Sequence, residues 1–351
     1  MKLPQKFDLP CAWKGADLAN KTEKWVRELS AGEISEIENA AEQFKQSGFS
    51  IEQVSPENFP LPTLSSTLND IRHQLQSGLG FTLIRGLPVS NYSIETSCSI
   101  FCGLGSYLGS ARSQNAQGHI LGHVCDVGGD LNDTSVRIYQ TAKRQTFHTD
   151  SCDAVGLLCL KEAMEGGDSL LAATHTIYNE LSQRSPHLAP YLFEPIATDR
   201  RGEVPVGAQP FFQIPVLNWH KGKLTGLYQR QYIDSASRFE NAPTPDPLHI
   251  EALDQFDEIA NDPDIHLRMR LEPGDMQFVY NHTNLHDRTA FRDWPEPQNR
   301  RHLLRLWLAL PEDRELPAVF RERYGTIEIG NRGGIVVKGT KLNVPLAPHQ
   351  V

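Results

Sequence analysis

Cysteine is scarce in this sequence, and a recognisable targeting segment is missing. The 351 residues include only six cysteines, and no two of them form a C-x-x-C pair, which argues against a structural zinc site. The first ten residues contain no apolar run and are interrupted by Pro4 and Pro10, unlike a secretory signal. We therefore expect a cytoplasmic protein whose cysteines stay reduced.

Long apolar runs and clusters of basic residues are also absent. The longest apolar stretches, Ala154–Leu160 and Leu303–Leu310, are far shorter than the ~20 residues of a membrane-spanning helix. Lys and Arg total 34 against 43 Asp and Glu, a net charge of −9 without any run of five basic residues. This balance argues against nucleic acid as a partner. A small-molecule substrate is the expected partner, and a homo-oligomer is left open.

The first third of the chain has the periodicity of amphipathic helices. Apolar residues recur every three or four positions in Glu33–Gln46 and Thr67–Ser77, and a glycine ends each segment. Ile94–Leu108 is also predicted to be helical, although Gly103 and Gly105 lower its helix propensity.

Short β-rich runs separated by turn residues dominate the chain from about residue 136. The predicted strands are Phe81–Arg85, Val136–Tyr139, Thr146–Asp150, Ala154–Leu160, Ser169–Ala172, Phe211–Pro215, Leu224–Tyr232, His266–Leu271, Met276–Tyr280 and Leu303–Leu310. Two predicted helices, Thr174–Gln183 and Ile250–Ile259, interrupt them without the strict alternation of a doubly wound sheet. The pattern predicts a mainly β barrel or sandwich with flanking helices.

A single domain over residues 1–351 accommodates all of these segments. We expect a helical N-terminal part at 1–110, a β core at 135–310 with an insert at 175–265, and a C-terminal segment at 311–351 that wraps the surface.

The segment Thr146-Phe-His148-Thr-Asp150 places a histidine and a carboxylate two positions apart. Side chains at i and i+2 of a strand point to the same face, so His148 and Asp150 would converge. They supply two of the three ligands of the facial triad that binds non-haem Fe(II) and leaves positions open for O2. A second match, His249-Ile-Glu251, starts a predicted helix, where i and i+2 do not face each other, and is interpreted as accidental.

A third ligand has to come from another part of the chain. His286 has the best context because it follows the predicted strand Met276–Tyr280, and His282 is its rival there. Further on, Arg301 and Arg305 share one face of a predicted strand, among Leu and Trp residues. Two buried guanidiniums need anions, which are either internal acids or a ligand carboxylate gripped through two parallel hydrogen bonds.

Three sequence blocks occur in a fixed order along the chain. The blocks are Phe147-His-Thr-Asp150, then Gly166-Gly-Asp-Ser169, then Leu285-His-Asp-Arg-Thr-Ala-Phe291 followed by Arg301-His-Leu-Leu-Arg305. Together they resemble the taurine dioxygenase-like (TauD/TfdA) family of Fe(II)/2-oxoglutarate-dependent oxygenases. The resemblance covers about Arg112 to Leu310 and implies a double-stranded β-helix, or jelly roll, with an N-terminal helical region and helical insertions.

The resemblance also implies a role for each site residue. The implied iron ligands are His148, Asp150 and His286. Arg301 would hold the distal carboxylate of 2-oxoglutarate. Ser169 stands where the family usually has threonine and keeps the hydroxyl that binds the same carboxylate. Arg305 corresponds to a second arginine that in some members contacts substrate or co-substrate.

The implied reaction is the oxidation, with hydroxylation as the expected form, of an unactivated C–H bond in a small organic molecule. It would use Fe(II), 2-oxoglutarate and O2 and release succinate and CO2. Halogenating relatives replace the carboxylate ligand with a small residue, whereas Asp150 is intact here. A substrate with a carboxylate or another anionic group is expected if Arg305 faces the pocket rather than an internal acid.

Two other functions are compatible with a barrel that carries these residues. A His/Asp/His site can hold Zn or Mn in a cupin-like hydrolase or isomerase, and a barrel without activity can bind a small molecule. The pair Arg301 and Ser169 would have no evident use in the first, and the complete ligand set argues against the second.

Three features could belong either to the pocket or to the rest of the fold. Asp199–Ala208 is predicted to be a substrate lid or a static loop. Cys152 lies two residues beyond Asp150 and would line the pocket or pack in the core. The aromatic residues with the same two alternatives are Phe211, Phe212, Trp219 and Tyr228.

Overall fold

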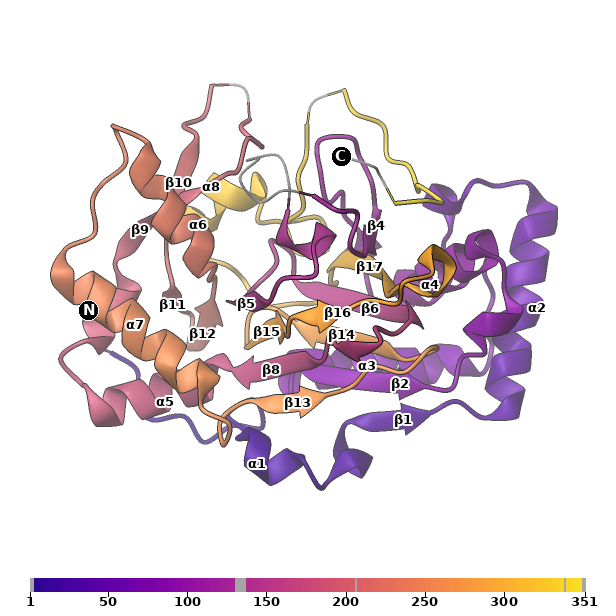
Figure 1. The fold of residues 1–351 in the computed structure, drawn as a ribbon, viewed down its shortest axis with the longest axis horizontal. Coiled ribbons are helices and arrows are strands. Elements are labelled where there is room, and N and C mark those ends of the chain that lie inside the picture. The colour runs from indigo at the N-terminus through magenta and orange to yellow at the C-terminus, as the bar shows by residue number, and fades with distance from the viewer. Residues whose placement is uncertain (1–2, 130–136, 206, 338, 349–351) are drawn as a thin grey trace.

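Two β-sheets lie face to face at the centre of the structure, with helices on the outer side of each (Figure 1). This computed structural model describes residues 3–129, 137–205, 207–337 and 339–348. The larger sheet has seven strands in the order β1-β2-β14-β6-β17-β3, with β4 beside β17. Its strands are β1 (Val26–Glu28), β2 (Phe81–Arg85), β3 (Ser110–Ala111), β4 (Leu121–Val124), β6 (Ala154–Lys161), β14 (Met276–Tyr280) and β17 (His302–Ala309).

The smaller sheet has four strands in the order β13-β8-β15-β5. Its strands are β5 (Gln145–His148), β8 (Ser169–Ala173), β13 (Leu267–Met269) and β15 (Asn284–Arg288). Three antiparallel pairs stand beside the two sheets. They are β9 (Pro195–Asp199) with β10 (Phe211–Pro215), β11 (Leu217–His220) with β12 (Lys223–Gly226), and β7 (Glu165–Gly166) with β16 (Phe291–Arg292).

Helices cover the outer faces of both sheets. Helices α2, α3 and α4 pack on the larger sheet, and α5 and α7 pack on the smaller one; α2 and α7 lie at opposite ends of the view in Figure 1. The helices are α1 (Gly15–Leu18), α2 (Ala31–Ser47), α3 (Leu64–Ser77), α4 (Ile94–Leu108), α5 (Thr174–Arg184), α6 (Arg230–Ser235), α7 (Pro247–Asn261) and α8 (Arg321–Tyr324). None of the helices in the described ranges has the length and apolarity that a membrane crossing requires.

The two faces of β17 point in different directions. One faces the helices, and the other faces the space between the two sheets. The residues that point outward and pack with the helices are Leu304, Leu306 and Leu308. Leu303 and Trp307 point inward and pack with residues of the smaller sheet, and Arg305 shares their parity. A shift of one residue would exchange the two sets, so burial of the leucines fixes the direction in which Arg305 points.

Helix α4 confirms the helix predicted for Ile94–Leu108 despite its two glycines. A Cβ atom at Gly105 would lie 2.7 Å from Cδ1 of Leu306 on β17. Glycine therefore lets the helix approach the sheet closely, and the packing gained offsets the low helix propensity of glycine.

The predicted β core with flanking helices is confirmed, but the strand Thr146–Asp150 ends at His148. The strand expected at Leu224–Tyr232 divides into β12 and α6, and the ion pair of Arg230 with Asp234 one turn later stabilises the helix. For the expected strand Val136–Tyr139, Val136 lies outside the described residues, and a 3-10 turn forms at Ile138–Gln140 instead. The division of the chain into one domain with three parts stays a prediction.

Strand β15 was not predicted, although it carries His286. All five of its residues, Asn284–Arg288, are buried, and four of them are polar or charged. An alternation of apolar and polar residues is the sequence signal of a half-buried strand. This strand lacks that signal because its buried positions are filled by hydrogen-bonding and charged side chains.

The C-terminal segment reaches the interior through Arg332, which is fully buried. Its Nε lies 2.7 Å from Asp153 Oδ1, and its Nη2 lies 2.9 Å from Asp313 Oδ2. His282 Nε2 is 2.8 Å from the same Asp153 oxygen. Asp153, His282 and Asp313 are close enough to hold a metal ion, but Arg332 already supplies a positive charge among them.

Replacing Arg332 by alanine should destabilise the fold strongly, because it leaves two carboxylates in the interior without their cation. We expect the free energy of unfolding to fall by about 3–5 kcal/mol. Urea denaturation followed by circular dichroism measures this change. Arg321→Ala, at an exposed position of α8, is the matched control and should change stability little. A loss below about 1 kcal/mol for Arg332→Ala would contradict the role given to this cation.

Candidate metal centre

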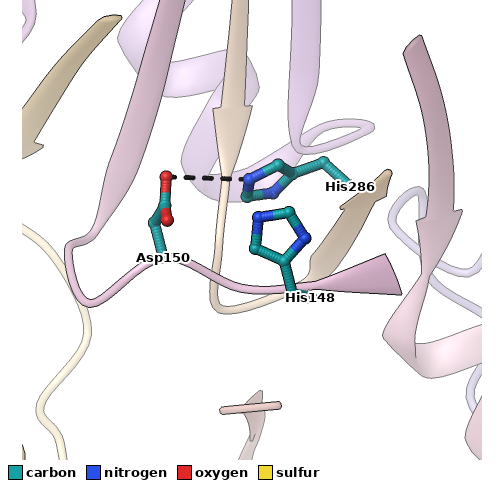
Figure 2. A group of neighbouring side chains, drawn as sticks. All are labelled: His148, Asp150 and His286. Carbon is teal, nitrogen blue, oxygen red and sulfur yellow. Dashed lines mark ion pairs between the residues drawn. The ribbon is translucent and has the colours of Figure 1, made fainter. Parts of the chain in front are cut away.

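Three side chains, two from neighbouring strands and one from the loop after the first strand, converge on one point between the sheets (Figure 2). His148 is the last residue of β5, Asp150 follows two residues later, and His286 stands opposite His148 in the antiparallel pairing of β5 with β15. The two imidazole rings are 4.1 Å apart between centroids, and His286 Nε2 is 3.7 Å from Asp150 Oδ2. One ligand atom from each residue lies within 4.8 Å of the other two.

Backbone hydrogen bonds hold the loop that carries Asp150. The Thr149 N–H donates to the Tyr228 carbonyl at 2.8 Å, so the chain after His148 pairs with the segment after β12 rather than continuing β5. The Asp150 N–H donates to the side-chain oxygen of Asn281 at 3.0 Å. The sequence therefore predicted the convergence of His148 and Asp150 correctly, but a fixed turn brings Asp150 into place instead of a continuous strand.

The electrostatics of the site keep the His148 imidazole and the Asp150 carboxylate in ligand-competent forms. Burial, together with the neighbouring His286, lowers the pKa of His148 to about 3, so this imidazole is neutral at neutral pH. Its Nδ1 lies 2.8 Å from the Thr146 carbonyl and donates to it, so the lone pair is on Nε2. That lone pair accepts a hydrogen bond from the Gln145 amide at 2.8 Å, which a metal ion would have to displace. Burial alone would raise the pKa of Asp150, but Arg305 and His286 outweigh it and lower that pKa.

The sequence did not identify two side chains that contact the candidate ligands. The Trp307 indole N–H donates to Asp150 Oδ2 at 2.8 Å. The Gln145 amide donates to His148 Nε2 at 2.8 Å. Trp307 could have been found, because it has the same strand parity as Arg301 and Arg305. No sequence signal distinguishes Gln145 from other glutamines.

A small cavity lies between the candidate iron ligands and the predicted 2-oxoglutarate-binding pair, Ser169 and Arg301. Its lining includes His148, His286, Ser169 and Arg301. Arg301 is 5% exposed, and its Nη1 is buried with no hydrogen-bond partner among the described residues. The side chain lies over the Phe291 ring at 5.2 Å and passes Gly167, where a Cβ atom would be 2.9 Å from Arg301 Nε. Glycine at 167 thus leaves room for the guanidinium.

Ser169 and Arg288 lie on the same inner face as His286. The Ser169 hydroxyl donates to Gln277 Oε1 at 3.0 Å, so its lone pairs can still accept a hydrogen bond and its proton can be redirected. Arg288 donates to the carbonyls of Thr141 and Lys143. Burial and the nearby Arg301 lower the pKa of Arg288 to about 9. The cavity is therefore rich in positive charge and can accept a dicarboxylate.

Arg305 contacts an internal acid. An anionic substrate is expected from this residue only if it faces the pocket instead, so Arg305 gives that expectation no support. Its Nη1 is 3.7 Å from Asp150 Oδ2, and its Nε donates to Gln114 Oε1 at 2.7 Å. The guanidinium lies between the rings of Tyr139 and Trp307, at 4.5 and 5.1 Å from their centroids. These contacts orient Arg305 toward Asp150, so Arg305 alone no longer argues for an anionic substrate.

A second and larger cavity of about 550 Å³ opens beside the candidate ligands and shares Gln145, His148 and Arg305 with the small one. Arg201, Gly202 and Glu203 from the predicted lid segment line it, and Val206 of that segment lies outside the described residues. Whether the segment closes over a substrate stays a prediction. The predicted aromatic residues separate into Phe212 and Tyr228, which line this cavity, and Phe211 and Trp219, which pack in other apolar clusters.

The remaining candidates lie away from the centre. Cys152 is fully buried and packs in the apolar cluster between the sheets. His282, the rival of His286, pairs with Asp153 instead. His249 contacts Asp246 and Glu194, which agrees with the interpretation of its H-x-E match as accidental.

Comparison with known proteins gives a consistent result. The family model described as taurine catabolism dioxygenase TauD, TfdA family matches residues 43–307. FR-33289 synthase of Streptomyces rubellomurinus is 33% identical over 309 residues, which cover 87% of this chain and 91% of the relative.

Solved structures with little sequence identity share the fold. An asparagine oxygenase in complex with Fe(II), (2S,3S)-3-hydroxyasparagine and succinate has a TM-score of 0.64 at 18% identity, over 81% of this chain and 93% of its own. The non-haem iron oxygenase OrfP in complex with Fe and α-ketoglutaric acid has a TM-score of 0.62 at 17% identity, with the same coverage. The chain belongs to the TauD/TfdA family, and it is an Fe(II)- and 2-oxoglutarate-dependent dioxygenase.

Proposed function

We propose that His148, Asp150 and His286 hold the Fe(II) of this dioxygenase between the two sheets. The observation that carries the proposal is the convergence of their ligand atoms within 4.8 Å beside a cavity lined by Ser169 and Arg301. Two imidazoles and one carboxylate are the donor set of a facial triad, which leaves adjacent positions on the metal for 2-oxoglutarate and O2. The low pKa of His148 supports the neutral form that a metal ligand must have.

Arg301 and Ser169 are proposed to bind the distal carboxylate of 2-oxoglutarate. The buried Nη1 of Arg301 supports this role, since a buried N–H group without a hydrogen-bond partner is costly, whereas Nη2 of the same guanidinium reaches only the Gly167 carbonyl, at 3.4 Å. A carboxylate can accept two parallel hydrogen bonds from the guanidinium and a further one from the Ser169 hydroxyl. Serine in place of the usual threonine preserves that hydroxyl.

The side chains around the centre orient the ligands and exclude water. Bound iron and 2-oxoglutarate supply the oxidising chemistry, in which the co-substrate becomes succinate and CO2. Trp307 and Arg305 hold the Asp150 carboxylate from one side, through the hydrogen bond of 2.8 Å and the ion pair of 3.7 Å. Leu303, which is buried beside Arg301 and Arg305, helps to keep the inner wall apolar.

The proposed reaction is hydroxylation of a C–H bond in a small organic molecule that occupies the larger cavity. A volume of about 550 Å³ is within the usual range for a small-molecule site. Because Asp150 retains the carboxylate ligand, the position that chloride takes in halogenating relatives is filled. The substrate is proposed to carry an anionic group, an expectation that now rests on arginines other than Arg305.

The architecture around this centre is proposed to be a double-stranded β-helix within a single domain. The facing seven- and four-stranded sheets support the first part. The apolar cluster that contains residues of both sheets supports the second.

Alanine at His148 or Asp150 should abolish iron-dependent turnover, because each replacement removes one of three ligands. We expect affinity for Ni(II), a redox-inert substitute, to fall about 100-fold or more in titration calorimetry, and succinate formation to disappear. His249→Ala removes the histidine of the other H-x-E match and should leave both readings unchanged. Turnover at the wild-type rate in the His148 and Asp150 variants would contradict the assignment.

Replacing Arg301 by glutamine should weaken the binding of 2-oxoglutarate and leave metal binding unchanged. Loss of a charge-assisted contact predicts a rise of about 10- to 100-fold in the KM for 2-oxoglutarate, with unchanged Ni(II) affinity. Ser169→Ala should raise the same KM by a smaller factor, since one neutral donor is lost. Arg300→Gln, at the adjacent exposed position, is the matched control. An unchanged KM in Arg301→Gln would mean that a different cation binds the distal carboxylate of 2-oxoglutarate.

A further inference from the structure

Three arginines gather on one wall of the larger cavity, around a single glutamate. Arg137, Arg201, Arg323 and Glu203 all line this cavity, whereas none of them lines the small cavity of Arg301 and Ser169. The three arginines come from distant parts of the chain, and no motif connects them.

Contacts hold this group in place as a built site. The two oxygens of Glu203 are shared, with Oε1 at 3.0 Å from Arg137 Nη2 and Oε2 at 3.7 Å from Arg323 Nη2. Arg137 Nη2 also donates to the Arg201 carbonyl at 2.8 Å. Arg323 Nε donates to the Ser151 hydroxyl at 2.8 Å, which links the group to the residue after Asp150. The guanidiniums of Arg137 and Arg323 are therefore held by protein contacts, and that of Arg201 lies over the Tyr232 ring at 5.7 Å.

The cavity has more positive charge than its own acids neutralise. Four lining guanidiniums, those of Arg137, Arg201, Arg305 and Arg323, face two carboxylates, those of Glu203 and Asp150. Asp199 lies 4.0 Å from Arg201, but Arg238 neutralises that carboxylate from 3.0 Å. Fe(II) and 2-oxoglutarate carry equal and opposite charges, so their binding leaves the excess unchanged.

Two of these arginines also have unused hydrogen-bonding capacity. Nη1 of Arg137 and Nε of Arg201 are buried and have no hydrogen-bond partner among the described residues. The side chains of Arg137 and Arg201 are only 15% and 17% exposed, so water compensates these donors poorly. An anion that reaches both guanidiniums from the cavity would offset the excess charge and accept from these donors.

We propose that Arg137 and Arg201, with Arg323 and Glu203 behind them, bind a doubly charged phosphonate or phosphate group of the substrate. This inference rests on the proposed iron centre, because the anchored molecule has to reach across the cavity to that centre. A dianion matches the two uncompensated charges, whereas a single carboxylate would leave one of them buried. The planar guanidinium suits a tetrahedral oxyanion because it donates two parallel hydrogen bonds to it.

Two probes of nearly the same shape but different charge separate the effect of ligand charge from the effect of ligand size. Methylphosphonate is largely dianionic at about pH 8, and methanesulfonate is a monoanion of nearly the same size. The protein loaded with Ni(II) and saturated with 2-oxoglutarate is titrated with each probe by calorimetry at low ionic strength, where screening is weak. We expect saturable binding of methylphosphonate, tighter than that of methanesulfonate by about tenfold or more. Absence of saturable methylphosphonate binding, or equal affinity for both probes, overturns the proposal.

Variants locate the binding group. Arg137→Gln and Arg201→Gln should each lower the affinity for methylphosphonate about tenfold or more, because each removes a charged donor. Arg270→Gln changes the net charge equally at a residue that pairs with Glu162 on the surface, and should leave the affinity unchanged. Equal weakening in all three variants would indicate a non-specific charge effect and reject the site.

The same titrations separate this inference from the iron centre. Affinities for Ni(II) and 2-oxoglutarate are measured in every variant before the probes are added. If both are normal and Arg137→Gln binds methylphosphonate like the wild type, the arginine site is wrong and the metal centre stands. If the wild type itself binds neither Ni(II) nor 2-oxoglutarate, the proposed centre fails first.

Discussion

The structure depends on the two-residue alternation of side chains along strands that are buried on both faces. On β17, β8 and β15 one parity packs against helices and the other points between the sheets. His286, Ser169, Arg301 and Arg305 all belong to the inward parity, as does His148 on β5. Because a shift of one residue would bury charges against helices and expose leucines to the cavity, the hydrophobic core fixes the register of the site.

The interior that results is unusually polar, and it is stable only because its charges are matched. Asp150 is neutralised by Arg305 and hydrogen-bonded by Trp307, while Asp153 is neutralised by Arg332. These two acids are three residues apart and are served by separate cations. Arg301, Arg137 and Arg201 each keep a buried donor without a hydrogen-bond partner among the described residues, and we propose that ligands bind at these three side chains.

Much of this arrangement could be predicted from the sequence, since the signals were local. The spacing of His148 and Asp150, and the parity of Arg301 and Arg305, each follow from strand geometry. Strand β15 could not be predicted, because its buried polar residues erase the alternation that identifies strands. The group of Arg137, Arg201 and Arg323 was also missed: its members meet only through the tertiary fold and share no motif.

Arg332 lies 179 residues beyond Asp153, and its guanidinium is synthesised after all the strands of the two sheets. A nascent chain still short of residue 332 has Asp153 and Asp313 without this countercharge, next to the loop that carries Asp150. Asp153 therefore gains this countercharge only after residue 332 has left the ribosome, when every strand of the two sheets has already been synthesised.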